Sequence, residues 1–460
     1  MLDNPGSPGL ADRSLDSQAD PFAVFGSNCI GFTLLLYRSS TLHMAFSTLL
    51  FAPGNRLISI LVFLFYATLL STKDMYSYGA GALALFSLWK IRDLRNIELG
   101  TKEKLILIWM LAFAGISIAV TVWHGSYMRS FEVPVKFVFG VLLVLCMIRF
   151  PPQPGMFWLG LCTGAAAGLA VASWKMWQAG DFKAFGFTGA IQFGNLALSM
   201  AVLLMAALCW LLAHQNMNRR LWFTILTIGV VCGLLGSYYS GTRGGWVAIP
   251  LFILLFLFAY VRRSNVLACS VVLLALVASI GLLAFQSPLV GERIALVHHE
   301  LADYEINGTS SSSSLGARFA IWEASWELLK ERPILGFGEV GYRKALQLRT
   351  EAGLVGAVPA SLANTHNAFL EFWVLYGLLA LFSLLAMMLS AGWYFLSYIR
   401  NKDSVLRSYA LSGACLVGGY FIYGQTQIML SRNNTLLFFL CTLAILIGLM
   451  HQRQCELAKV

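Results

Sequence analysis

The sequence predicts an all-α polytopic membrane protein with about 12 transmembrane helices and one large outer loop that contains amphipathic helices. Of its 460 residues, 58% are hydrophobic and only 12% are charged, and the mean hydropathy is +0.72. A soluble domain carries about 25% charged residues. The apolar residues gather in stretches of about 15 to 25, long enough for a helix to cross a bilayer, whereas barrel strands would alternate over about ten. These observations exclude barrels, secreted disulfide scaffolds and disordered chains.

The predicted spans are the apolar runs bounded by charged residues, glycine or proline. In chain order they are residues 57–70, 74–89, 105–122, 135–149, 156–174, 188–213, 221–238, 244–260, 266–285, 367–398, 408–427 and 434–450. Residues 1–56 form a polar tail whose apolar stretch 29–52 is expected to be an interfacial helix or an additional crossing. The first bundle therefore covers 57–285, the last three spans lie within 367–450, and 451–460 form a second tail.

Basic residues are distributed unevenly between the two ends of these spans. With both termini on one face, that face carries Lys90, Arg92, Arg95, Lys102, Lys104, Arg149, Arg219, Arg220, Arg262, Arg263, Arg400, Lys402, Arg407, Arg453 and Lys459. The short loops of the other face carry only Lys73, Arg129, Lys175, Lys183, Arg243 and Arg432. Cytoplasmic loops are enriched in Lys and Arg, so both termini are expected in the cytoplasm. The net charge of +10 thus indicates topology, and no nucleic-acid partner is expected.

The segment 286–366 is a large outer loop, and such a loop beside a membrane is where chemistry is expected. Within it, Phe319, Trp322, Trp326 and Leu329 recur at helical spacing on one side. This pattern predicts an amphipathic helix that lies on the membrane or on the bundle.

The first candidate site element is the turn Ser240-Gly241-Thr242-Arg243-Gly244-Gly245-Trp246 between two spans. Its glycines allow close backbone approach and positive φ, so the turn can present amide donors together with a guanidinium. That combination suits phosphate oxygens. The alternative interpretation is a tight interhelical turn with a snorkelling arginine.

The next candidates are Arg318 and His366. Arg318 lies near the start of the predicted loop helix, where its charge would add to the free backbone N–H groups and favour an anion; a simple surface arginine is the alternative. His366 lies where the loop returns to the membrane, and nearby arginines with partial burial would keep its imidazole neutral, as a general base requires. A purely structural histidine is the alternative.

Further residues are expected to help bind substrate. Glu371 is an acid just inside a span, costly unless it has a function or a partner, and it could orient His366 or pair with an arginine. The remaining expected contacts to diphosphate or lipid are Gly244, Gly245, Trp322, Asn367, Lys175, Lys183 and Arg129. No metal site is expected, because the adjacent histidines His298 and His299 cannot both point the same way from a helix.

In their order and spacing, four motifs resemble the bacterial O-antigen ligase and polymerase superfamily. They are Gly241-Thr242-Arg243-Gly244-Gly245-Trp246, Arg318-Phe319-Ala320-Ile321-Trp322, Pro333-Ile334-Leu335-Gly336-Phe337-Gly338 and His366-Asn367-Ala368-Phe369-Leu370. The resemblance covers about residues 190–430. It implies a glycosyltransferase of the bacterial inner membrane whose large loop is periplasmic and whose donor is an undecaprenyl-diphosphate-linked glycan.

For an O-antigen ligase, the resemblance implies transfer of the glycan to a sugar hydroxyl of the lipid A core, with inversion at the anomeric carbon. Arg243 and Arg318 would clamp the diphosphate and His366 would accept the acceptor proton. Two permanent cations could make a divalent ion unnecessary, so no cofactor is expected. The alternatives are an O-antigen or capsule polymerase with a second lipid-linked glycan as acceptor, a protein O-oligosaccharyltransferase, and a transporter of polyprenyl-linked sugars.

Overall fold

The computed structural model describes residues 56–180, 183–213, 218–242, 244–262, 298–300, 302–306, 308, 311, 313–362 and 364–459. Throughout this part of the chain the regular structure is helical, which confirms the predicted all-α class. The N-terminal tail with its stretch 29–52, the predicted span 266–285 and Arg243 lie outside the described residues.

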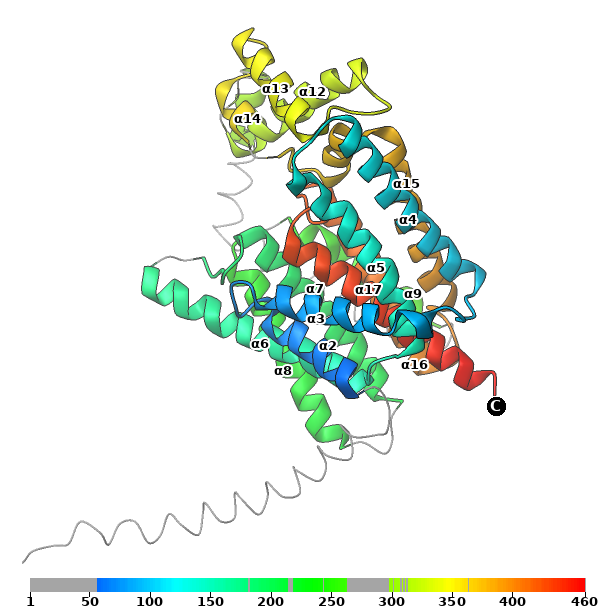
Figure 1. The fold of residues 1–460 in the computed structure, drawn as a ribbon. Coiled ribbons are helices and arrows are strands. Elements are labelled where there is room, and N and C mark those ends of the chain that lie inside the picture. The colour runs from blue at the N-terminus through cyan, green and yellow to red at the C-terminus, as the bar shows by residue number, and fades with distance from the viewer. Residues whose placement is uncertain are drawn as a thin grey trace, which may run out of the picture. The chain divides into compact units, whose positions relative to one another are not determined.

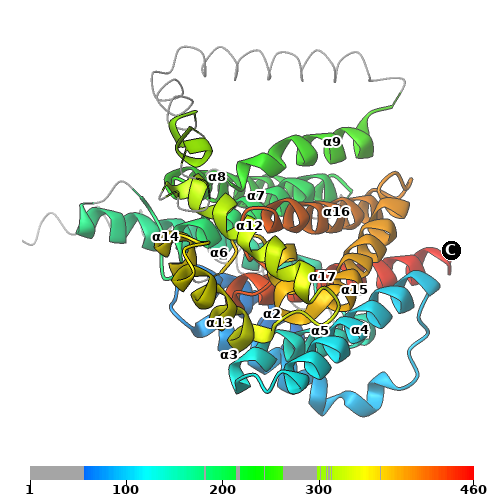
Figure 2. The same cartoon turned by 90° about the horizontal axis from the view of Figure 1, so that it is seen from above.

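The membrane bundle is built from long apolar helices (Figures 1 and 2). In the first half they are α2 (Arg56–Leu69), α3 (Met75–Trp89), α4 (Thr101–Trp123), α5 (Glu132–Arg149), α6 (Pro154–Ala179), α7 (Ala190–Leu211), α8 (Arg219–Tyr239) and α9 (Ile249–Tyr260), with the short 3-10 helices η1 (Ile91–Leu94), η2 (Met128–Phe131) and η3 (Trp246–Ala248). The last three are α15 (Ala368–Tyr398), α16 (Ser404–Gly424) and α17 (Asn433–Leu457). Every predicted span other than 266–285 coincides with one of these helices. Eight helices of the described residues are long and apolar enough to cross a membrane.

The centre of the bundle is α17. In its apolar window 94% of the residues are buried, against 33% in α8, so protein surrounds α17 on all sides. It packs against α5 and α16, and Thr442 on α17 shares a 2.8 Å hydrogen bond with the buried Tyr66 on α2. The helix closest to the C-terminus therefore ties the first helices of the bundle to the last.

One end of the bundle gathers basic residues that the charge pattern assigns to a single face. Three of them join different helix ends: Lys102 Nζ to Ser397 Oγ at 2.6 Å, Arg400 to the Val261 carbonyl at 3.1 Å, and Arg453 to Asp403 at 2.7 Å. Their grouping agrees with the predicted topology, in which these residues share one side of the membrane.

The opposite end carries three further helices, α12 (Ser314–Glu331), α13 (Gly338–Glu351) and α14 (Ala357–Ser361) (Figure 1). They enclose a small apolar core of their own, to which α15 also contributes: Ile321, Ala324, Leu328, Leu329, Phe337, Tyr342, Leu346, Val355 and Val374. The loop helix is present as predicted, and small residues form much of the side by which it packs on its neighbours. Trp326 is 51% exposed, whereas Ala317, Ala320 and Ala324 are buried, because small residues let α12 approach the neighbouring helices closely.

The unit formed by α12, α13 and α14 is hydrogen-bonded to the bundle at a break in α15. Gly377 has φ 81°, outside the helical region, so the hydrogen bond that Leu378 N would donate to the Val374 carbonyl is not made. Both groups bond to the segment before α13 instead. Phe337 N donates to the Val374 carbonyl at 2.7 Å, and Leu378 N lies 3.1 Å from the carbonyls of Pro333 and Ile334.

Replacing Gly377 with alanine should loosen this attachment. The positive φ costs a non-glycine residue about 1–3 kcal/mol, and the new Cβ would also collide with the Ile334 carbonyl. We expect an apparent Tm several degrees lower in a thermal melt of the purified protein. Gly392→Ala is the matched control, since a Cβ there, on the same helix, meets nothing within 4 Å. Equal shifts in both variants would contradict this role of the break.

Candidate functional site

His366 lies in a short loop at the start of α15 and adopts a left-handed backbone, φ 55°, the one positive φ of a non-glycine residue among those described. Its N–H donates to Asn364 Oδ1 at 3.0 Å. The N–H of Thr365 donates to the Glu371 carboxylate at 2.8 Å. Such a strained conformation persists only where its surroundings enforce it, and it is frequent at functional sites.

Two of the residues expected to bind substrate shape this loop. Asn367 caps α15, with Oδ1 accepting from Phe369 N at 3.0 Å and from Leu370 N at 3.1 Å. Glu371 lies one turn into the helix, is buried, and bonds the backbone next to His366. Glu371 therefore helps to fix the position of His366 by binding the backbone N–H of its neighbour Thr365.

Trp322 joins the loop to α12. Its indole N–H donates to the Thr365 carbonyl at 2.6 Å. Arg318 precedes Trp322 by one helical turn, so both lie on the same side of α12. The structure thus brings together Arg318 and His366, which are 48 residues apart in the sequence.

The charges around His366 favour its neutral form. Burial lowers the pKa of the imidazole most, followed by the positive charges of Arg318 and Arg432, while an interaction with Gln427 partly offsets them. Burial also lowers the pKa of Arg318, partly offset by Glu300. A guanidinium nevertheless stays charged at neutral pH. A neutral imidazole beside a permanent cation is suited to accept a proton while the cation binds an anion.

Two residues facing His366 are missing from the sequence-based site. Gln427 and Arg432 belong to the segment 425–432 between α16 and α17. The sequence marks Arg432 only as an outer-face charge, and nothing in the local pattern connects it with a histidine 66 positions earlier. Its position in a short polar loop on the predicted outer side was the only available signal.

The glycine-rich turn lies beside that same segment. A Cβ on Gly244 would lie 3.1 Å from Thr426 Oγ1, and one on Gly245 would collide with Asn195 at the start of α7. Gly241 has φ 68°, and a Cβ added there would lie 3.4 Å from the Lys183 side chain. Glycine is thus needed on both sides of position 243, because protein packs closely against the turn.

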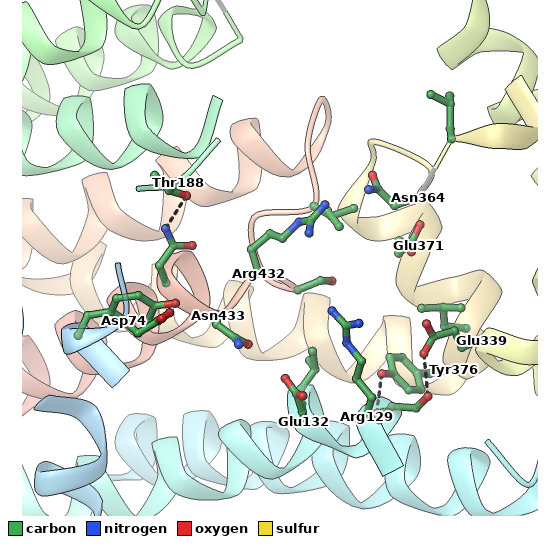
Figure 3. Close-up of a pocket in the computed structure, with 18 of the residues that line it drawn as sticks. Asp74, Arg129, Glu132, Thr188, Glu339, Asn364, Glu371, Tyr376, Arg432 and Asn433 are labelled. Carbon is green, nitrogen blue, oxygen red and sulfur yellow. Dashed lines mark hydrogen bonds between the residues drawn. The ribbon is translucent and has the colours of Figure 1, made fainter. Parts of the chain in front are cut away.

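Lys175, Lys183 and Arg129, the basic residues of the first half that were expected to bind substrate, lie in three different places. Lys183 lies at the glycine-rich turn, whereas Lys175 donates to the Gly186 carbonyl at 3.1 Å and sits 3.5 Å from the Phe187 ring centroid, which is an anchoring role. Arg129 lines a cavity together with Glu371 and Arg432 (Figure 3). Among the described residues, no three His, Cys, Asp or Glu side chains form a group that could hold a metal ion.

This cavity has a volume of about 610 Å³, and neither Trp322 nor His366 lines it. It is bounded by the starts of α3 and α5, the end of segment 425–432, α13, and the residues that lead into α15. Asn364 and Glu371, which hold the His366 loop, are also part of its wall. The volume falls in the range usual for a small-molecule site.

Residues 228–385 match the model of the O-antigen ligase family, and this range contains Arg243, Arg318 and His366. The match confirms the resemblance to that family. A Haemophilus influenzae protein described as uncharacterized is 24% identical over 387 residues, which is 83% of this chain and 95% of that protein.

The chain is therefore a multi-pass membrane protein with a region similar to the O-antigen ligases. That match points to glycosyl transfer of the ligase and polymerase kind, and to lipid-linked glycans as partners.

The hydrogen bond from Trp322 should control the order of the His366 loop. Trp322→Phe keeps an aromatic ring but removes the donor, at a cost of about 1 kcal/mol, so the amides of residues 364–367 should exchange about fivefold faster in a hydrogen–deuterium experiment. Trp326→Phe is the control, because its half-exposed ring packs on Trp373 away from Thr365. Unchanged exchange in Trp322→Phe would show that the bond does not hold the loop.

The lowered pKa of His366 also predicts a pH effect on stability. The unfolded chain binds this proton near the ordinary pKa of about 6.5, but the folded protein binds it only at lower pH. Stability is therefore fully present above about pH 6.5 and falls as the pH drops from there through the folded pKa. In melts between about pH 7.5 and pH 5.5, the wild type should lose more Tm than His366→Gln. A loss of equal size in the two proteins would contradict the lowered pKa.

Proposed function

We propose that the protein is an O-antigen ligase, which transfers an undecaprenyl-diphosphate-linked polysaccharide to a sugar hydroxyl of the lipid A core. The observation that supports this most directly is the half-buried, neutral His366 beside the cations of Arg318 and Arg432. The glycine-rich turn that carries Arg243 packs against Thr426, which belongs to the same segment 425–432 as Arg432. A base among fixed positive charges is what displacement of a diphosphate leaving group requires.

In the proposed reaction, His366 removes the proton from the acceptor hydroxyl as its oxygen attacks the anomeric carbon of the donor. A new glycosidic C–O bond forms, and the bond from that carbon to the diphosphate oxygen breaks. The electron pair leaves with undecaprenyl diphosphate, and Arg243 and Arg318 stabilise the added charge. Attack opposite the leaving group inverts the anomeric centre. The reaction uses no metal or other cofactor, because the arginines carry the charge.

We further propose that this end of the bundle faces the periplasm and that both termini are cytoplasmic, in the inner membrane. The positive-inside distribution supports this orientation, since Lys102, Arg400 and Arg453 lie at the other end. The segment 286–366 would then be the periplasmic loop between a first bundle, 57–285, and the last spans, 367–450. The lipid chain of the donor would lie among the spans that flank this loop.

A polymerase is the nearest alternative, because the motifs that bind the donor do not specify the acceptor. Lipopolysaccharide from a deletion strain distinguishes the two on a gel. A ligase leaves bare core while long polymer accumulates on undecaprenyl diphosphate. Core capped by a single repeat would instead mean a polymerase, and unchanged lipopolysaccharide would favour protein glycosylation or transport.

The assigned roles predict different defects in purified protein with isolated donor and acceptor. His366→Ala should lower kcat by about 10²- to 10⁴-fold while donor affinity stays near the wild-type value, because the base acts in the chemical step. Arg318→Gln should weaken donor binding as well, because a charge partner of the diphosphate is lost. Lys344→Gln, an exposed charge of the same loop, is the control and should retain activity. Transfer by His366→Ala at the wild-type rate would disprove the mechanism.

A further inference from the structure

The cavity beside the His366 loop is lined by arginines other than Arg243 and Arg318, which are proposed to clamp the diphosphate. Figure 3 shows Arg129, from η2, and Arg432, from the segment before α17, with guanidinium groups that point into it from different walls. Among the described residues neither guanidinium has a hydrogen-bonded or ion-paired carboxylate. Two arginines that point into one cavity with no such counter-charge favour an anionic ligand.

Four carboxylates line the wall, those of Asp74, Glu132, Glu339 and Glu371. Asp74 lies at the start of α3 and forms no ion pair with either arginine among the described residues, and the other three already have partners. Ser130 Oγ donates to Glu339 at 2.8 Å, Lys136 lies 3.3 Å from Glu132, and Glu371 accepts from the Thr365 backbone. These contacts fix the carboxylates to the wall. The arginines remain available for a ligand.

The rest of the wall suits a saccharide. Three amide side chains, Asn364, Asn433 and Asn434, and three tyrosines, Tyr76, Tyr342 and Tyr376, line the cavity. Amides donate and accept hydrogen bonds at once, which matches sugar hydroxyls, and aromatic faces cover the apolar side of a sugar ring. A ligand with hydroxyls and one acidic group would satisfy both the amides and the arginines.

The position of the cavity indicates which substrate it takes. Its wall contains neither Arg318 nor Trp322, so it is separate from the residues proposed for the donor diphosphate. It reaches His366 through two shared residues: Asn364 bonds the His366 backbone, and Arg432 lowers the pKa of its imidazole. His366 itself does not line the cavity, but a ligand there would lie next to the loop that carries this base.

We propose that this cavity is the acceptor subsite and that it binds a saccharide bearing a phosphate or carboxylate group, with Arg129 and Arg432 as partners of that anion. This assignment rests on the proposed glycosyl transfer and adds the chemical class of the acceptor. The anionic group would anchor the saccharide so that one of its hydroxyls reaches His366.

Binding without the donor tests the subsite independently of catalysis. The probe is core oligosaccharide released from lipopolysaccharide, titrated calorimetrically into the full-length protein in detergent. Arg129→Gln should raise the Kd at least tenfold, and Arg432→Gln should do the same, whereas Arg432→Lys should recover part of the affinity. Lys344→Gln is the control, with the wild-type Kd.

Chemical treatment of the same probe identifies the anion. If phosphate is recognised, phosphatase treatment of the oligosaccharide should raise the wild-type Kd to the level of Arg129→Gln and leave Arg129→Gln unchanged. If carboxylate is recognised, amidation of the carboxyl groups should have that effect. A Kd unaffected by both treatments and by both Arg→Gln substitutions would overturn the proposal.

Steady-state kinetics of glycan transfer then test the acceptor subsite and the proposed ligase activity separately. Arg129→Gln should raise KM for the acceptor with little change in kcat or in KM for the donor. A rise confined to the donor KM would overturn the assignment, since the cavity would then hold the donor. Arginine-dependent binding of the oligosaccharide without any transfer would retain the subsite and refute the ligase activity.

Discussion

The break of α15 at Gly377 is the constraint on which the arrangement of the site depends. In an uninterrupted helix the backbone N–H and C=O groups would bond to one another, and none would be left to bond the segment before α13. Because the helical hydrogen bonding is interrupted there, the Val374 carbonyl and the Leu378 N–H bond to the segment 333–337. The small apolar core of α12 and α13 therefore packs against α15. Arg318 on α12 and His366 at the start of α15 thereby share one rigid support. Sites built on such supports hold their geometry better than sites on free loops.

The His366 loop is held from both of its sides. On one side Trp322 bonds the Thr365 carbonyl, and on the other Glu371 bonds the Thr365 amide. Asn364 and Asn367 fix the backbone before and after the histidine. The strained φ of His366 follows from this set of bonds, and the imidazole is kept neutral by burial and two arginines. A base prepared in this way needs little rearrangement when substrates arrive.

The proposed division of substrates follows from the same geometry. Arg318 and Trp322 belong to α12, and neither of them lines the cavity that contains Arg129. Arg432 acts on both, because it lines the cavity and influences His366. Two anionic substrates would repel each other, and Arg129 at the cavity together with Arg243 and Arg318 at the diphosphate would reduce that cost.

The sequence by itself determined the class of the protein and most of its spans, because the cost of placing polar groups in lipid is local and leaves a hydropathy pattern along the chain. It also proposed His366 and Arg318 as site residues from their short motifs, and their roles stay a prediction. It could not identify Arg432 or Gln427 as neighbours of His366, nor the cavity that Arg129 shares with Arg432, because these contacts join loops of helices that are distant in the chain. Nor could it show that Ala320 and Ala324 are buried on α12 while Trp326 is half exposed, because hydrophobic spacing marks a stripe of large residues and close packing selects the small ones.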